Sequence, residues 1–184
     1  MWPNAQDLAV ADYPVDLERE RTLFDGRKVL VRPIRADDAA MEQDFVRHLS
    51  PDSRYARFMA TLNELPANKL RYLTDVDYEH HLALVALVEH DGETVEVGSA
   101  RYVLDPSGTS CEFAVTVDDA WQGSGIAGVL MFTLMDVARS RGIETMDGLV
   151  LASNHKMLKF ARQLGFAQER VPDDPGTIRV FRKL

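Results

Sequence analysis

The chain has 184 residues, of which 46% are hydrophobic and 27% charged, as expected for one globular domain with a sizeable core. Its formal net charge of -8 argues against binding to nucleic-acid phosphates and favours cationic partners such as amines. The longest apolar run, Leu82–Val88, is too short to cross a membrane, and the first residues do not read as a secretory signal. With the single cysteine Cys111 no intramolecular disulfide can form, and we expect a cytoplasmic protein.

The first part of the chain is predicted to contain a leader, one strand and three helices. Prolines and Gly26 interrupt residues 1–26, which we expect to be a leader or a strap over the surface, whereas 27–184 form the domain. A first strand is predicted over Lys28–Ile34. Acidic residues or a Ser-Pro pair mark helix starts. The helices are predicted over residues 37–48, 51–60 and 66–73.

The middle of the chain is predicted to be a meander of strands. His81–Glu89 is nearly continuously apolar, as in a strand covered on both faces. Asp91-Gly92 supplies a turn into a second strand over Thr94–Leu104, and Cys111–Val117 is the third.

The last third alternates helices and strands. Apolar residues recur with helical spacing over Gly125–Arg141, so this segment is predicted to be a long amphipathic helix. A strand over 145–151, a helix over 154–164 and closing strands over 166–169 and 177–181 follow. The fold class is therefore mixed α/β around one sheet.

A glycine-rich loop lies between the third meander strand and the long helix. Its sequence is Gln122-Gly123-Ser124-Gly125-Ile126-Ala127-Gly128. Glycines let the backbone approach a ligand closely, and the unpaired amides of a helix N-terminus bind phosphate groups. We therefore interpret this loop as a pyrophosphate site.

Two other phosphate-binding motifs fit this loop less well. The run from Gly123 to Gly128 matches the G-x-G-x-x-G dinucleotide fingerprint, but Asp118–Gln122 separate it from the strand and no acid ends the next strand. A P-loop is excluded because no Gly-Lys-Ser/Thr follows.

The same loop matches the pattern Q/R-x-x-G-x-G/A as Gln122, Gly125 and Ala127, and in this the chain resembles the GNAT family of N-acetyltransferases. The order of predicted elements is similar to that family over about residues 27–184. Shorter matches resemble the acetyltransferase domain of bacterial Pat-type protein-lysine acetyltransferases. They are Tyr13-Pro14, Arg32-Pro33-Ile34-Arg35, Ser50 with Arg57-Phe58, and Glu112-Phe113-Ala114-Val115.

The resemblance implies a single mixed, mostly antiparallel sheet of about six to seven strands, flanked by helices and splayed into a central V. It implies acetyl-CoA as co-substrate and no metal. The backbone amides of the loop would hold the CoA pyrophosphate, namely those of Gln122, Gly123, Ser124, Gly125, Ile126 and Ala127. Val115 and Val117 would pair with the pantetheine arm through their backbone, as an added strand does. Asn154 would bind the pantetheine region and also cap the following helix.

The transfer needs a neutral amine. The pKa of a free lysine is about 10.4, so fewer than roughly one in a thousand is neutral near pH 7. By resemblance Glu112 is the general base that accepts the proton, and the amide of Val115 could polarise the thioester carbonyl. The tyrosine that many family members use as general acid is replaced by Ala161, as is common in Pat-type domains.

We therefore expect an N-acetyltransferase whose acceptor is a protein lysine. A small-molecule amine acetyltransferase and a non-catalytic acyl-CoA-binding or sensing module remain the alternatives. A homodimer is possible by resemblance alone. Other reactive side chains are interpreted as structural, since Cys111 suits core packing and His80-His81 would point to opposite sides of a strand.

Overall fold

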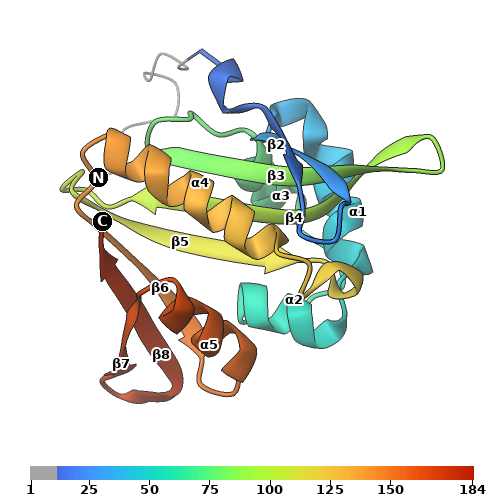
Figure 1. The fold of residues 1–184 in the computed structure, drawn as a ribbon. Coiled ribbons are helices and arrows are strands. Elements are labelled where there is room, and N and C mark those ends of the chain that lie inside the picture. The colour runs from blue at the N-terminus through green and yellow to red at the C-terminus, as the bar shows by residue number, and fades with distance from the viewer. Residues whose placement is uncertain (1–11) are drawn as a thin grey trace.

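Eight strands form one sheet in the order β1-β2-β3-β4-β5-β6-β8-β7 in the computed structural model, which describes residues 12–184 (Figure 1). The strands are β1 (Arg19–Thr22), β2 (Lys28–Pro33), β3 (His81–His90), β4 (Glu93–Leu104), β5 (Ser110–Val117), β6 (Thr145–Leu151), β7 (Ala167–Val171) and β8 (Asp174–Lys183). Neighbouring strands are antiparallel except for the parallel pair β5 and β6. The prediction of a mixed, mostly antiparallel sheet is confirmed.

The first strand, β1, was not predicted from the sequence. Its four residues, Arg-Glu-Arg-Thr, are all exposed, so they show no alternation of apolar and polar residues. The strand pairs with β2 through its backbone, Arg19 opposite Val31 and Thr22 opposite Lys28. The expected leader over 1–26 thus contains a short 3-10 helix, η1 (Val15–Leu17), and an edge strand, and its residues 1–11 lie outside the described part.

Helices cover both faces of the sheet (Figure 1). Those before the meander are α1 (Ala39–His48), α2 (Pro51–Phe58) and α3 (Ala67–Thr74), and those after it are α4 (Ile126–Ser140) and α5 (His155–Gln163). Short 3-10 helices η2 (Ala36–Asp38) and η3 (Asp119–Trp121) precede α1 and α4. Helix α4 packs on β3, β4 and β5, and α1 packs on β4 from the opposite face.

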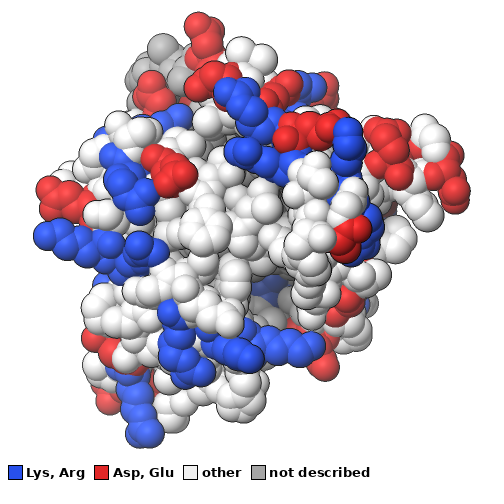
Figure 2. Space-filling model, viewed as in Figure 1, with Lys and Arg blue, Asp and Glu red and all other residues white. Residues whose placement is uncertain are grey.

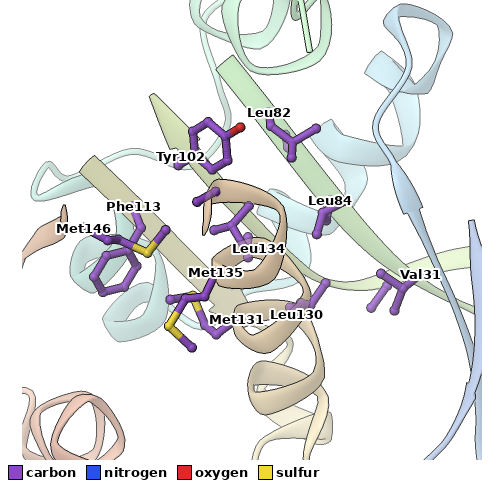
Figure 3. Close-up of a cluster of buried hydrophobic side chains, with 14 of the residues drawn as sticks. Val31, Leu82, Leu84, Tyr102, Phe113, Leu130, Met131, Leu134, Met135 and Met146 are labelled. Carbon is purple, nitrogen blue, oxygen red and sulfur yellow. The ribbon is translucent and has the colours of Figure 1, made fainter. Parts of the chain in front are cut away.

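The largest part of the core lies between α4 and the meander (Figure 3). Leu130 and Leu134, one helical turn apart, are both fully buried, and burial of each side chain contributes about 1.5–3 kcal/mol. On β4, a Cβ at Gly98 would lie 3.1 Å from Ile126 Cγ2 and 3.2 Å from the Thr116 carbonyl oxygen. This close approach fixes the start of α4 against the sheet.

The sheet opens between β5 and β6. These two strands pair only from Ser110 opposite Thr145 to Glu112 opposite Asp147. Beyond that point they diverge, and the predicted splayed V is present.

Candidate functional site

A cavity of about 990 Å³ lies at the open side of the V. The residues that line it come from α2, β5, the following loop, the first turn of α4, β6, α5 and the turn between β1 and β2. The space-filling view shows a hollow in this face of the molecule, with basic side chains on its rim (Figure 2). Loop, strand edge and helix starts therefore meet around one space.

The open edge of β5 presents free backbone groups to this cavity. The Asp118 amide donates to the Val97 carbonyl oxygen at 2.9 Å, so the backbone of Asp118 points toward β4. Because peptide groups alternate along a strand, the backbones of Val115 and Val117 point the other way, toward the gap. The pairing with β6 ends at Glu112, before these two residues. An extended ligand could therefore pair with β5 as an added strand.

The glycine-rich loop has a backbone that glycine alone adopts easily. Gly123 and Gly125 have φ angles of 78° and 94°, in the left-handed region. Gly125 precedes the first residue of α4 and has no side chain with which to cap the helix. The Ile126 amide is within 3.4 Å of the Ser124 hydroxyl, whereas the amides of the rest of the first turn face the N-terminal end. The aligned peptide dipoles of α4 favour an anion here.

Not every residue of the predicted loop contacts the cavity. Gln122, Gly123, Gly125, Ile126 and Ala127 line it. Ser124 is only 4% exposed and does not line it, because its side chain turns inward toward the Ile126 amide.

A carboxylate fastens the loop to α2. The Asp119 side chain accepts hydrogen bonds from the Ser50 amide at 2.8 Å, the Ser50 hydroxyl at 2.9 Å and the Ser53 hydroxyl at 2.7 Å. These donors hold the pKa of Asp119 below its usual value although partial burial opposes them. The contact joins residues 69 positions apart, so sequence reasoning missed it.

Glu112 lies at the narrow end of the V. It is exposed, stands opposite Asp147 at the last paired position of β5 and β6, and does not itself line the 990 Å³ cavity. Its neighbour Phe113 does line it. From the register with β4, Glu112 shares a sheet face with Ala114 and Arg101, the face covered by α1.

Arg57 was also missed by sequence reasoning as a site residue. It lies on α2, lines the cavity, and its guanidinium is 4.9 Å from the centre of the Phe58 ring. Burial and the nearby Arg101 lower the pKa of Arg57 to about 10, although Glu42 and Glu112 attract its charge. The narrow end of the V therefore carries both signs of charge, since the Arg57 guanidinium interacts with the Glu112 carboxylate.

A buried polar cluster lies behind Arg57. The Arg101 guanidinium donates to the Leu73 carbonyl oxygen at 2.9 Å and to His81 Nε2 at 3.1 Å, and it lies 3.6 Å from the Glu42 carboxylate. Burial is the main cause that lowers the pKa of His81 to about 3, and the positive charge of Arg101 adds to it. Burial and the neighbouring Glu42 carboxylate raise the pKa of Glu96 well above its usual value.

The remaining candidates have structural contacts. Asn154 lines the cavity, and its side-chain oxygen accepts from the Met157 amide at 3.1 Å as the cap of α5. Cys111 is buried, which raises the pKa of its thiol to about 12. Ala161 is fully buried in the core. Among residues 12–184, no three His, Cys, Asp or Glu side chains are grouped to hold a metal ion.

Over the same residues, no helix has the length and apolar character needed to cross a membrane.

Comparisons with known proteins agree with this geometry. Residues 43–166 match the acetyltransferase (GNAT) family model. The chain is 43% identical over 153 residues to acetyltransferase PA5475 of Pseudomonas aeruginosa, covering 83% of this chain and 82% of that protein. It is 30% identical over 141 residues to acetyltransferase Pat of Mycolicibacterium smegmatis, covering 76% of this chain but 41% of Pat.

A solved structure with a similar fold is the GNAT domain of S. lividans PAT. The TM-score is 0.85 at 32% identity, covering 94% of this chain and all of that domain. The mixed sheet, its V-shaped opening and the loop before α4 are thus features of a known fold. The family uses acetyl-CoA and an amine acceptor, and the protein belongs to the GNAT family of acetyltransferases.

Proposed function

We propose that the protein transfers an acetyl group from acetyl-CoA to a protein lysine by direct attack, with Glu112 as general base. The observation that carries this proposal is the single cavity shared by the open edge of β5 and the N-terminus of α4. A diphosphate and an extended amide-containing arm need these two surfaces side by side.

The cofactor would be bound mainly by backbone. The amides of Gln122, Gly123, Gly125 and Ala127 would hold the pyrophosphate, with Ser124 and Ile126 shaping the loop from within. Val115 and Val117 would pair with the pantetheine arm, and Asn154 would contact it from the start of α5. In this orientation the thioester lies toward Glu112, at the closed end of the V.

Glu112 would make the amine reactive. Its carboxylate accepts a proton from the lysine ammonium, directly or through water, and the neutral nitrogen attacks the thioester carbonyl. The Val115 amide stabilises the developing negative charge on the carbonyl oxygen. The carbon–sulfur bond then breaks, and the CoA thiolate takes up the proton released by the new amide or one from water.

The proposal involves no intermediate in which the acetyl group is bound to a cysteine of the enzyme as a thioester. Cys111 is buried, and with a thiol pKa near 12 it is protonated at neutral pH. The buried Ala161 has no acidic group. The CoA thiolate therefore leaves without a protein acid, because it is a stable anion and water can protonate it.

The choice of a protein lysine rests on the likeness to the Pat domain, which extends over 94% of this chain. The net charge of -8 is consistent with a cationic acceptor. The second candidate, a small amine, is favoured by Arg57, because a cation beside Glu112 would attract the carboxylate of a small amino compound.

The test measures CoA release from acetyl-CoA with lysine peptides and with small amines. Glu112→Gln keeps the size of the side chain but removes its basicity, and turnover should fall at least about a hundredfold with acetyl-CoA binding unchanged. Glu93→Gln, at an exposed position at the start of β4, is the matched control and should turn over normally. Equal turnover of the Glu112→Gln variant and the wild type would refute the role of Glu112. If small amines that carry a carboxylate were acetylated faster than any peptide, the proposal of a protein acceptor would be rejected in favour of a small-molecule acceptor.

A further inference from the structure

An exposed aromatic ring lies against the glycine-rich loop that precedes α4. Phe24, in the turn between β1 and β2, is 80% exposed and lines the cavity. A Cβ placed on Gly125 would lie 3.3 Å from Phe24 Cδ1 and Cε1, so the ring rests directly on the loop backbone. Phe24 lies upstream of residues 43–166, which match the family model.

The turn is held in place without help from the ring. Leu23 is 5% exposed in the core, and its amide donates to the Arg27 carbonyl oxygen at 2.8 Å. Arg27 lies over the Trp121 ring at 4.0 Å and is hydrogen-bonded to Asp25 at 2.8 Å. The Phe24 ring is therefore positioned beside Gly125 while one of its faces stays open to solvent.

Basic residues outnumber acidic ones in the hairpin that carries the ring. The hairpin of β1 and β2 contains Arg19, Arg21, Arg27 and Lys28. Two of these cations are ion-paired within the hairpin, Arg27 with Asp25 at 2.7 Å and Lys28 with Glu20 at 2.8 Å. Figure 2 shows basic side chains beside the hollow, mainly below it in this view, and basic and acidic side chains intermingled on the side of the hairpin. An aromatic face, a phosphate-binding helix start and nearby cations together fit a nucleotide better than an acyl chain.

We propose that Phe24 is a stacking platform for the adenine base of acetyl-CoA. This inference rests on the proposed function, since it assumes that the pyrophosphate lies on the loop at Gly125. The pantetheine arm leaves the pyrophosphate along β5, so the adenosine leaves from its other side. A ring in contact with the pyrophosphate loop is within one ribose of that diphosphate.

Calorimetric titration can separate the two halves of the cofactor, because 4′-phosphopantetheine keeps the pantetheine arm and one phosphate of CoA but lacks its 3′-phosphoadenosine and the second phosphate. Phe24→Ala should weaken CoA binding by about five- to a hundredfold, the usual effect of losing one stacked base, and leave 4′-phosphopantetheine binding unchanged. Phe24→Trp should restore the CoA affinity. Phe132→Ala is the matched control, since Phe132 is 57% exposed on α4 and does not line the cavity.

Each other outcome has a defined meaning. Equal losses for CoA and 4′-phosphopantetheine would show that the ring supports the loop and would overturn the adenine assignment. Unchanged affinity for both ligands in Phe24→Ala would overturn it as well. Wild-type protein that binds neither ligand would instead contradict the proposed function, so the two failures are distinguishable.

Discussion

Gly148 on β6 is the residue whose substitution tests the V most sharply. It lines the cavity one position beyond the last β5–β6 pair. A Cβ at Gly148 would lie 2.9 Å from Phe113 Cε1 and 3.1 Å from the Phe113 carbonyl oxygen. The Phe113 ring is 6% exposed and packs 5.0 Å from the Phe166 ring, so it has little room to retreat. Gly148→Ala therefore forces β5 and β6 apart.

The expected cost can be bounded. Overpacking by one methyl in a tight core costs about 1–3 kcal/mol, and the lower entropy of the unfolded alanine chain returns about 0.4–1 kcal/mol. The net loss is about 0–2.6 kcal/mol, with a midpoint of about 1.3 kcal/mol. At the midpoint the Tm of a domain of this size falls by about 3–5 °C. The displaced edge of β5 should also weaken the binding of acetyl-CoA.

Urea unfolding followed by circular dichroism measures this loss, with Gly128→Ala as control. Both variants add one methyl, but a Cβ at Gly128 meets no atom within 4 Å and lies in helix α4, where alanine stabilises by about 0.5–1 kcal/mol. The free energies of unfolding should change in opposite directions. A Gly148→Ala protein as stable as the wild type, with an unchanged urea dependence, would show that the Phe113 ring yields and would refute the reasoning.

Three further predictions concern the surroundings of the cavity. Asp119→Ala removes the acceptor for Ser50 and Ser53 and should lower the free energy of unfolding by about 1–2 kcal/mol in the same urea assay; no change would show that α2 is held elsewhere. Cys111→Ala should keep full turnover, and mass spectrometry should find no acetylated Cys111 in the wild type; either a loss of turnover or an acetyl-cysteine would contradict direct attack. His81 has a folded pKa lowered to about 3, so the unfolded chain binds the extra proton below about pH 6.5, and stability should fall by about 1.4 kcal/mol per pH unit from there toward pH 3. His81→Gln should flatten that part of the pH profile of unfolding. A profile as steep as that of the wild type would show that His81 does not cause the loss of stability at low pH.

The elements that sequence patterns specify locally were predictable. The periodicity over Gly125–Arg141 and the glycines before it indicate a helix and its start, because both signals come from neighbouring residues. The meander was predictable for the same reason, since its strands are apolar and joined by short turns. The additional strand β1 has only exposed polar residues, and its pairing depends on β2 rather than on any pattern of its own.

Contacts between distant segments were not predictable from patterns. Arg101, on a strand that reads as apolar, meets Glu42 of α1 and His81 of β3 only after the sheet has assembled. Phe24 likewise reaches Gly125 because the β1–β2 turn folds over the loop. A motif identifies Gln122–Ala127, and the family resemblance adds Val115, Val117 and Asn154, which line the same cavity. Neither signal points to Phe24 or to Asp119.

The most direct test of the central claim is mass spectrometry of a lysine peptide incubated with acetyl-CoA and the wild-type protein. The account predicts one acetyl group on a lysine Nε for each CoA released. Tight binding of acetyl-CoA without transfer to any peptide or small amine would contradict it, and would identify the cavity as an acyl-CoA-binding module that does not catalyse transfer.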